Sequence, residues 1–70
     1  AQIHPHQAIV IENSPLGIEA ADRAGTFCLA VNTGPLHEDR LLAAGARAVF
    51  SSCSQLAERW REVVEIARAR

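Results

Sequence analysis

An acidic residue, an amide and a hydroxyl stand together near the start of the chain, where a strand is expected to end. Glu12, Asn13 and Ser14 directly follow the β-branched run 9–11, a pattern typical of a strand covered on both faces. Ligands of open α/β sheets bind in the crevice at the carboxyl ends of the strands. Glu12 and Asn13 are therefore the chain's best candidates for chemistry. From the residues alone, a surface acid that a helix dipole stabilises is an equal alternative for Glu12.

A helix must follow this acid–amide pair directly. Ser14 is a good N-cap, and Pro15 suits the first helical position, where its missing N–H is not needed. Gly25 stands where a glycine ends a helix. Glu19 and Asp22, one turn apart, are expected on the solvated face. Apolar and small residues recur at helical spacing and are expected to face the core: Leu16, Ala20, Ala21 and Ala24.

Three further elements are expected before the last helix. Residues 26–31 form a second apolar strand, and the turn residues 32–35 follow it. A single Gly34 before a proline lacks the spacing of a nucleotide-binding loop, so an ordinary turn is predicted. Residues 36–44 predict a short helix with Leu41 and Leu42 inward, and residues 46–50 a third strand.

The last helix carries a recognisable start signal. Ser52 can cap it, and Gln55 completes a capping-box pattern three residues later. One apolar stripe predicts the buried face of a single continuous helix: Leu56, Trp60, Val63, Val64 and Ala67.

The resulting order β-α-β-α-β-α predicts an α/β fold with a three-stranded parallel sheet and right-handed crossovers. If the strands run successively outward, the connecting helices all lie on one face. The other face is then bare, and the edge of the first strand is unpaired. Parallel sheets are normally covered on both faces, and open apolar edges invite association. We therefore expect either the C-terminal part of a larger doubly wound domain or pairing with a second copy.

Composition restricts the class of protein. Seventy residues, 49% of them hydrophobic and 21% charged, with a formal net charge of −1, indicate one small globular domain. No charge excess favours nucleic acid or a membrane surface, and no membrane-spanning or signal segment is evident. We expect a soluble, cytoplasmic chain. Cys28 should be a buried free thiol, and His4 and His6 exposed loop residues that bind no metal.

The motif resembles a known family. The run 10–21, followed by Ala24-Gly25 and the segment 30–34, is similar to the haloacid dehalogenase (HAD) superfamily, especially its phosphoglycolate-phosphatase and β-phosphoglucomutase-like members. Their fourth motif is an acidic pair after a core strand, then Ser-Pro-x-Gly and a helix ending in Ala-Gly. The resemblance covers residues from about Pro5 to Leu56, and it implies a Rossmannoid core with helices flanking the sheet.

The family's chemistry divides among several parts. An Asp-x-Asp motif supplies the nucleophile and the acid/base, a Ser/Thr and a Lys hold the phosphoryl group, and the fourth motif helps to bind Mg²⁺. The resemblance makes Glu12 and Asn13 the metal ligands, with Ser14 as N-cap and support of the metal shell. Asn13 stands where Asp is commoner, so the site has one negative charge fewer. The chain has no Asp-x-Asp and no lysine, so no catalytic residue is expected in it.

The resemblance implies that residues 1–70 are the C-terminal part of a HAD-like hydrolase core, lacking the nucleophile strand and the cap. The parent would be a Mg²⁺-dependent phosphohydrolase or sugar-phosphate mutase that acts on a phosphorylated small molecule, and the 70-residue chain alone would be inactive. The alternative is a non-catalytic α/β interaction module that self-associates through its open sheet edge.

Overall fold

A parallel sheet forms the centre of the molecule. The computed structural model describes residues 8–69, and its three strands lie in the order β1-β2-β3. They are β1 (Ile9–Glu12), β2 (Phe27–Val31) and β3 (Val49–Phe50). Both neighbouring pairs are parallel, which confirms the predicted fold class. Within the described range, β1 is an edge strand with no second neighbour, as expected.

The third strand is shorter than the predicted range 46–50. Only Val49 and Phe50 have regular strand geometry. The chain just before them still bonds to β2, because Arg47 N–H donates to Cys28 O at 2.8 Å and Ala30 N–H donates to Ala48 O at 3.0 Å. Pairing with β2 therefore begins before the regular strand does.

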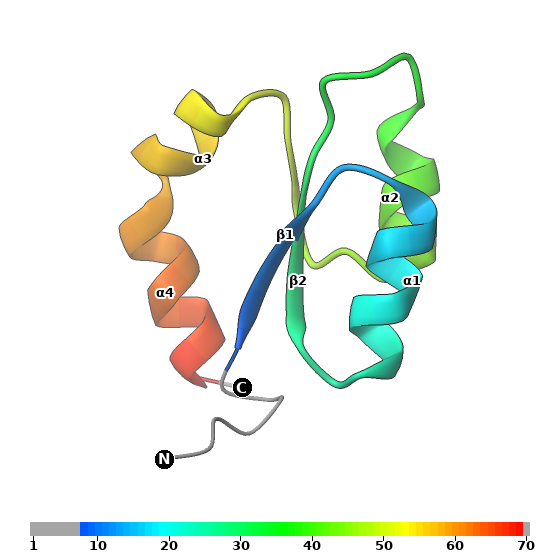
Figure 1. Ribbon diagram of the computed structural model, residues 1–70. Helices are drawn as coiled ribbons and strands as arrows, with labels where there is room; N and C mark the ends of the chain where they lie inside the picture. Colours follow the sequence, from blue (N-terminus) through cyan, green and yellow to red (C-terminus); the bar gives the residue numbers. More distant parts are fainter. Residues whose placement is uncertain (1–7, 70) are drawn as a thin grey trace.

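The two connecting helices cover one face of the sheet, as the right-handed crossovers require. They are α1 (Pro15–Arg23) and α2 (Glu38–Ala44), and Figure 1 shows them side by side. Ser14 caps α1, and Pro15 is its first residue, as predicted. Gly25 follows the helix with φ +79°. Six buried residues form the core on this face: Ile18, Ala21, Cys28, Ala30, Leu41 and Ala46.

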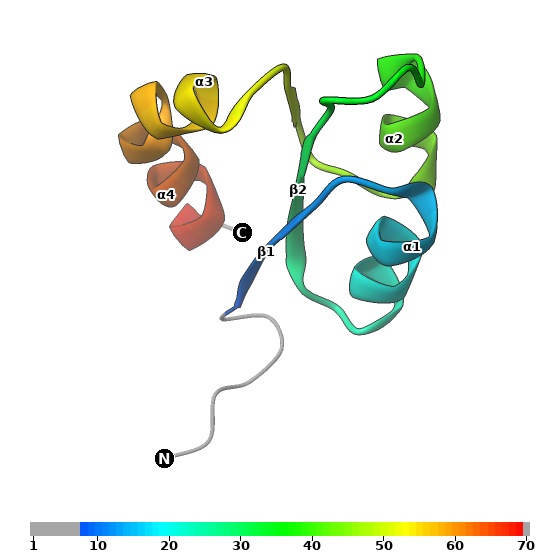
Figure 2. The same cartoon turned by 45° about the horizontal axis from the view of Figure 1, so that its top comes forward.

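The opposite face is not bare, which corrects the expectation from the sequence. Two further helices, α3 (Cys53–Glu58) and α4 (Trp60–Ala69), lie across it (Figures 1 and 2). No crossover follows β3 in this range, so handedness does not confine these helices to the first face. They bury the second set of side chains from β2. That core comprises Phe27, Leu29, Val31, Leu56 and Val63.

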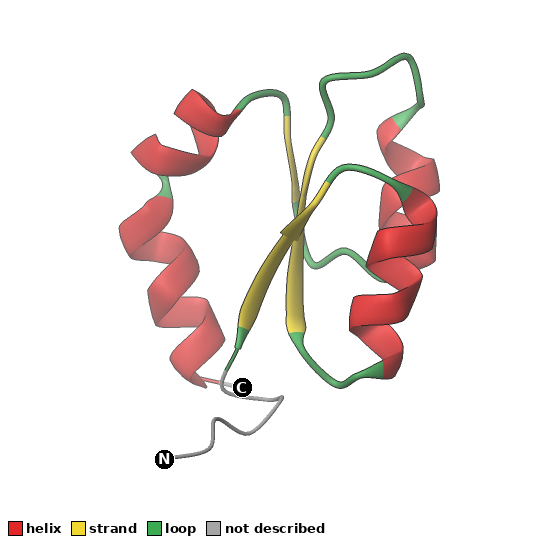
Figure 3. Ribbon diagram, in the orientation of Figure 1, coloured by secondary structure: helices red, strands yellow, loops and turns green. Residues whose placement is uncertain are grey.

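The expected single last helix is in fact two helices. Its start is as predicted, since Ser52 accepts a hydrogen bond from Gln55 N–H at 3.1 Å. Gln55 Oε1 accepts from Ser51 N–H at 2.7 Å, one residue before the cap. The helix then breaks at Arg59 (Figure 3). The break turns Trp60 outward, to 41% exposed, so the prediction that it anchors the buried stripe is wrong.

The inward faces of α1 and α2 also differ from expectation. Ile18 is fully buried, whereas Leu16, expected inward, is 79% exposed. In α2, Leu41 is fully buried and Leu42 is 43% exposed. In such short helices one or two side chains reach the core, and the angle at which the chain enters the helix decides which. Ala20 and Ala24, also expected inward, are exposed.

Other expectations concern single residues. Cys28 is a buried free thiol, as predicted, and Cys53 is an exposed one. His4 and His6 lie outside the described residues. No helix in the described range is long and apolar enough to cross a bilayer.

Candidate functional site

The acid–amide pair lies where the sequence predicts, at the corner between β1 and α1. Glu12 is the last residue of β1 and is half-buried, and Asn13 is exposed in the turn that follows. Ser14 Oγ accepts a hydrogen bond from Gly17 N–H at 3.2 Å and so satisfies one free amide of the first helical turn. The hydroxyl of Ser14 therefore acts as a cap for α1.

The side chain of Glu12 folds back over the helix that it precedes. Its carboxylate end lies against Gly17, in the first turn of α1. The N-terminus of a helix carries partial positive charge, which favours a carboxylate there. Among the residues that the structure describes, neither Glu12 nor Asn13 has a side-chain hydrogen bond or ion pair. Their oxygens are therefore available to a ligand.

An open pocket of about 340 Å³ lies at this corner. Its lining residues come from the carboxyl ends of β1 and β2, which meet at the same edge of a parallel sheet, and from the start of α3. Glu12 and Asn13 line it together with four other residues: Ile11, Val31, Thr33 and Cys53.

Sequence reasoning missed Thr33 and Cys53. Asn13 directly follows the first strand and Thr33 is the second residue after the second strand, so the strand-end rule that pointed to Asn13 could also have found Thr33. No local pattern distinguishes Cys53. Its place at the pocket depends on α3 starting beside the end of β2, which only the folded chain shows.

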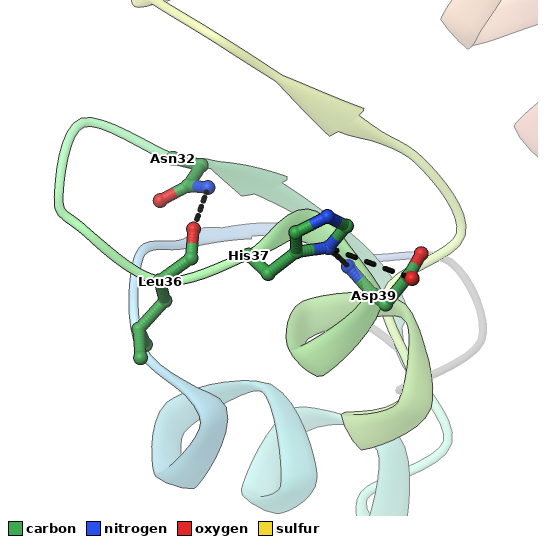
Figure 4. Close-up of polar contacts among 4 residues, drawn as sticks. All are labelled: Asn32, Leu36, His37 and Asp39. Carbon is green, nitrogen blue, oxygen red and sulfur yellow. Dashed lines mark hydrogen bonds and ion pairs between the residues drawn. The ribbon is translucent and has the colours of Figure 1, made fainter.

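The loop that carries Thr33 is held by its own polar contacts (Figure 4). Asn32 Nδ2 donates to Leu36 O at 2.7 Å and closes the loop. His37 caps α2, and its Nδ1 accepts from Asp39 N–H at 3.3 Å. The same Nδ1 lies 3.5 Å from Asp39 Oδ2. Both contacts place the His37 ring against the first turn of α2.

The charge of the corner reaches the core beneath it. Burial raises the pKa of the Cys28 thiol above its ordinary value, and the negative charges of Glu12 and Asp22 raise it further. The two exposed ion pairs of the described range, Arg59–Glu62 and His37–Asp39, leave Glu12 without a cation. The negative charge of Glu12 is therefore not offset by an ion pair in the described range and could be offset by a bound cation.

The donor set fits part of a magnesium shell. A carboxylate and an amide oxygen are hard ligands of the kind that Mg²⁺ takes in proteins. Within residues 8–69, no group of three or more His, Cys, Asp or Glu residues could hold a metal. The two oxygens therefore offer an incomplete shell, which ligands from elsewhere would have to complete.

Comparison with known proteins points in the same direction. No protein-family model matches the chain. Over 41 residues it is 49% identical to the validoxylamine A 7'-phosphate phosphatase of Streptomyces hygroscopicus subsp. limoneus, a match that covers 59% of this chain and 18% of that protein.

A solved structure is similar over most of the chain. It is that of a protein assigned as a β-phosphoglucomutase from Bacteroides vulgatus, with a TM-score of 0.78 and 48% identity over 90% of this chain and 26% of that one. The chain thus matches about a quarter or less of either protein's length. With its acid–amide corner on parallel strands, it is similar to a fragment of the phosphatase and β-phosphoglucomutase-like proteins of the HAD superfamily.

Proposed function

We propose that residues 1–70 form the C-terminal part of the core of a Mg²⁺-dependent HAD phosphohydrolase or sugar-phosphate mutase, and that Glu12 and Asn13 are its fourth-motif metal ligands. The observation that carries the proposal is the corner itself. Two oxygen-bearing side chains without partners in the described range face one pocket at the carboxyl ends of β1 and β2. Phosphorylated small molecules are the proposed substrates, and the cytoplasm the proposed location.

The proposed role of each residue follows from the chemistry of its side chain. Glu12 would supply charge to the cation and Asn13 an amide oxygen, while the capped helix keeps both at the strand end. Bound Mg²⁺ would offset negative charge on the phosphoryl oxygens. Asp22 and Asp39 lie in α1 and α2 and form no Asp-x-Asp. The nucleophile would therefore come from outside these 70 residues.

Paramagnetic Mn²⁺ tests the metal site, because it substitutes for Mg²⁺ and broadens the NMR signals of nearby residues. We expect titration of the 70-residue chain to broaden the amides around Glu12 and Asn13 first. Glu12→Gln should weaken binding by on the order of tenfold. Asn13→Asp should strengthen it, since it adds a charge. Glu38→Gln, an exposed acid on α2, is the matched control. Broadening centred elsewhere would refute the site.

An activity assay tests whether the nucleophile comes from outside the 70-residue chain. With Mg²⁺, the 70-residue chain should release no phosphate from p-nitrophenyl phosphate, whereas a longer gene product with an upstream Asp-x-Asp strand should. Turnover by the short chain would contradict the proposal.

One observation favours the alternative, an interaction module that pairs through its sheet edge. Ile11 lies on the edge strand β1 and is 46% exposed. Size-exclusion chromatography separates the two functions. A dimer that Ile11→Lys abolishes, with no Mn²⁺ broadening at Glu12, would favour the module, whereas a monomer would count against it.

A further inference from the structure

Gly17 stands where the backbone gives no reason for a glycine. It lies in the first turn of α1, and its φ is not positive, unlike that of Gly25 and Gly45. Glycine in a helix is less favourable than alanine. Helix propensity therefore argues against glycine at this position, so the glycine must be explained by the groups that approach it.

What approaches Gly17 is the carboxylate of Glu12. A methyl group placed on Gly17 would overlap Glu12 Oε1 and come within 2.5 Å of Cδ. The carboxylate thus occupies the space that any other side chain at position 17 would fill. The contact involves the far end of a flexible side chain, so a substitution would displace Glu12 rather than disrupt the fold.

The position has an electrostatic consequence. At the first turn of α1, the carboxylate lies next to the positive end of the helix dipole. The N–H of Gly17 itself is already bonded to Ser14 Oγ. The positive end of the helix dipole therefore attracts the carboxylate and leaves the amide of Gly17 paired, so the carboxylate oxygens keep their capacity to bind.

We propose that Gly17 is a positioning residue: its missing side chain provides the space that holds the Glu12 carboxylate against α1 and so at the metal site. The inference rests on the proposed function, because it takes Glu12 to be a ligand. With alanine at position 17, Glu12 must adopt another rotamer, and its carboxylate leaves its place against the first turn of α1.

The variant Gly17→Ala in the 70-residue chain tests this, and Gly34→Ala is its matched control. A methyl group at Gly34 meets nothing within 4 Å, and its φ is not positive. We expect Gly17→Ala to weaken Mn²⁺ binding several-fold, and Gly34→Ala to leave it unchanged. Adding Glu12→Asp to Gly17→Ala should restore part of the affinity, because the side chain shorter by one methylene no longer reaches the new methyl group. A merely structural role for Gly17 would predict no such rescue.

The possible results separate the two claims. Any one of the following results would overturn the positioning role. Gly17→Ala binds Mn²⁺ with wild-type affinity, or both glycine variants lose the same affinity. Adding Glu12→Asp does not rescue binding, or circular dichroism shows that Gly17→Ala is unfolded. If the wild-type chain shows no Mn²⁺ broadening around Glu12, the proposed metal site fails instead. In that case, an NOE between Glu12 Hγ and Gly17 Hα tests separately whether the Glu12 side chain packs against Gly17. If this NOE is absent, the packing of Glu12 on Gly17 is refuted too.

Discussion

Two glycines in this small fold each lie against a carboxylate side chain, for different reasons. At the β1–α1 corner, Gly17 has ordinary helical backbone, and only the close approach of Glu12 explains it. At the end of α2, Gly45 has φ +122°, and the Asp22 side chain packs against it. The first glycine leaves room for the carboxylate that we propose as a metal ligand, and the second ends a helix. Contact with an acid therefore does not by itself mark a site.

Substitution at Gly45 should have the largest effect on stability. Gly45→Ala forces a Cβ into a left-handed backbone conformation and to 2.8 Å from Asp22 Cγ. We expect the free energy of unfolding to fall by about 1–3 kcal/mol, measured by urea denaturation. Mn²⁺ affinity of the folded protein should stay unchanged. A loss of affinity without a loss of stability would erase the distinction between the two glycines.

The two carboxylates should act alike on one property, the pKa of Cys28. Their charges, together with burial, raise that pKa above its ordinary value of 9.0. The folded chain therefore keeps the thiol proton to higher pH than the unfolded chain does. This contribution to stability is complete below pH 9 and is lost as pH rises above it, with a slope of at most about 1.4 kcal/mol per pH unit.

The test follows the Cys28 Cβ chemical shift against pH in a Cys53→Ser background. Glu12→Gln and Asp22→Asn should each lower the pKa of Cys28, whereas Glu38→Gln should not. Cys28→Ala should remove the slope of stability above pH 9. If only one of the two substitutions lowers the pKa of Cys28, the prediction that both carboxylates raise it is wrong.

Substitution at Gly17 should have the smallest effect on stability. Alanine gains about 0.5–1 kcal/mol as a helix former, while the displaced Glu12 loses about 0.3–1 kcal/mol at the helix N-terminus. These changes nearly cancel, so urea denaturation should show a difference below about 1 kcal/mol. A much larger loss would mean that Gly17 serves the fold, as Gly45 does.

Local signals were sufficient to predict most of the fold. A β-branched run, a Ser-Pro start and a glycine end identified β1 and α1, because each depends on a few neighbouring residues. The position of α3 and α4 on the second sheet face was not predictable from such local signals. It depends on where the chain turns after β3 and on the break at Arg59, which no proline or glycine marks.

The candidate site was predictable in part for the same reason. Glu12 and Asn13 follow from one strand end and one helix cap, both local features. Cys53 required the three-dimensional neighbourhood of β1, β2 and α3. Gly17 did have a signal, a glycine within a helical pattern, but its meaning depends on a side chain five residues earlier.

The break at Arg59 divides the helical layer on the second sheet face into two short helices, α3 and α4. Val63 is the buried residue of α4 in the described range, and Val64 and Ala67 are half-buried. A helix with so little buried surface opens at low free energy while the rest stays folded. Hydrogen exchange should therefore be fast along α4 and slow along β2, whose five residues are all buried. We therefore expect α4, and not the strand that it covers, to be the part of this fold that opens first.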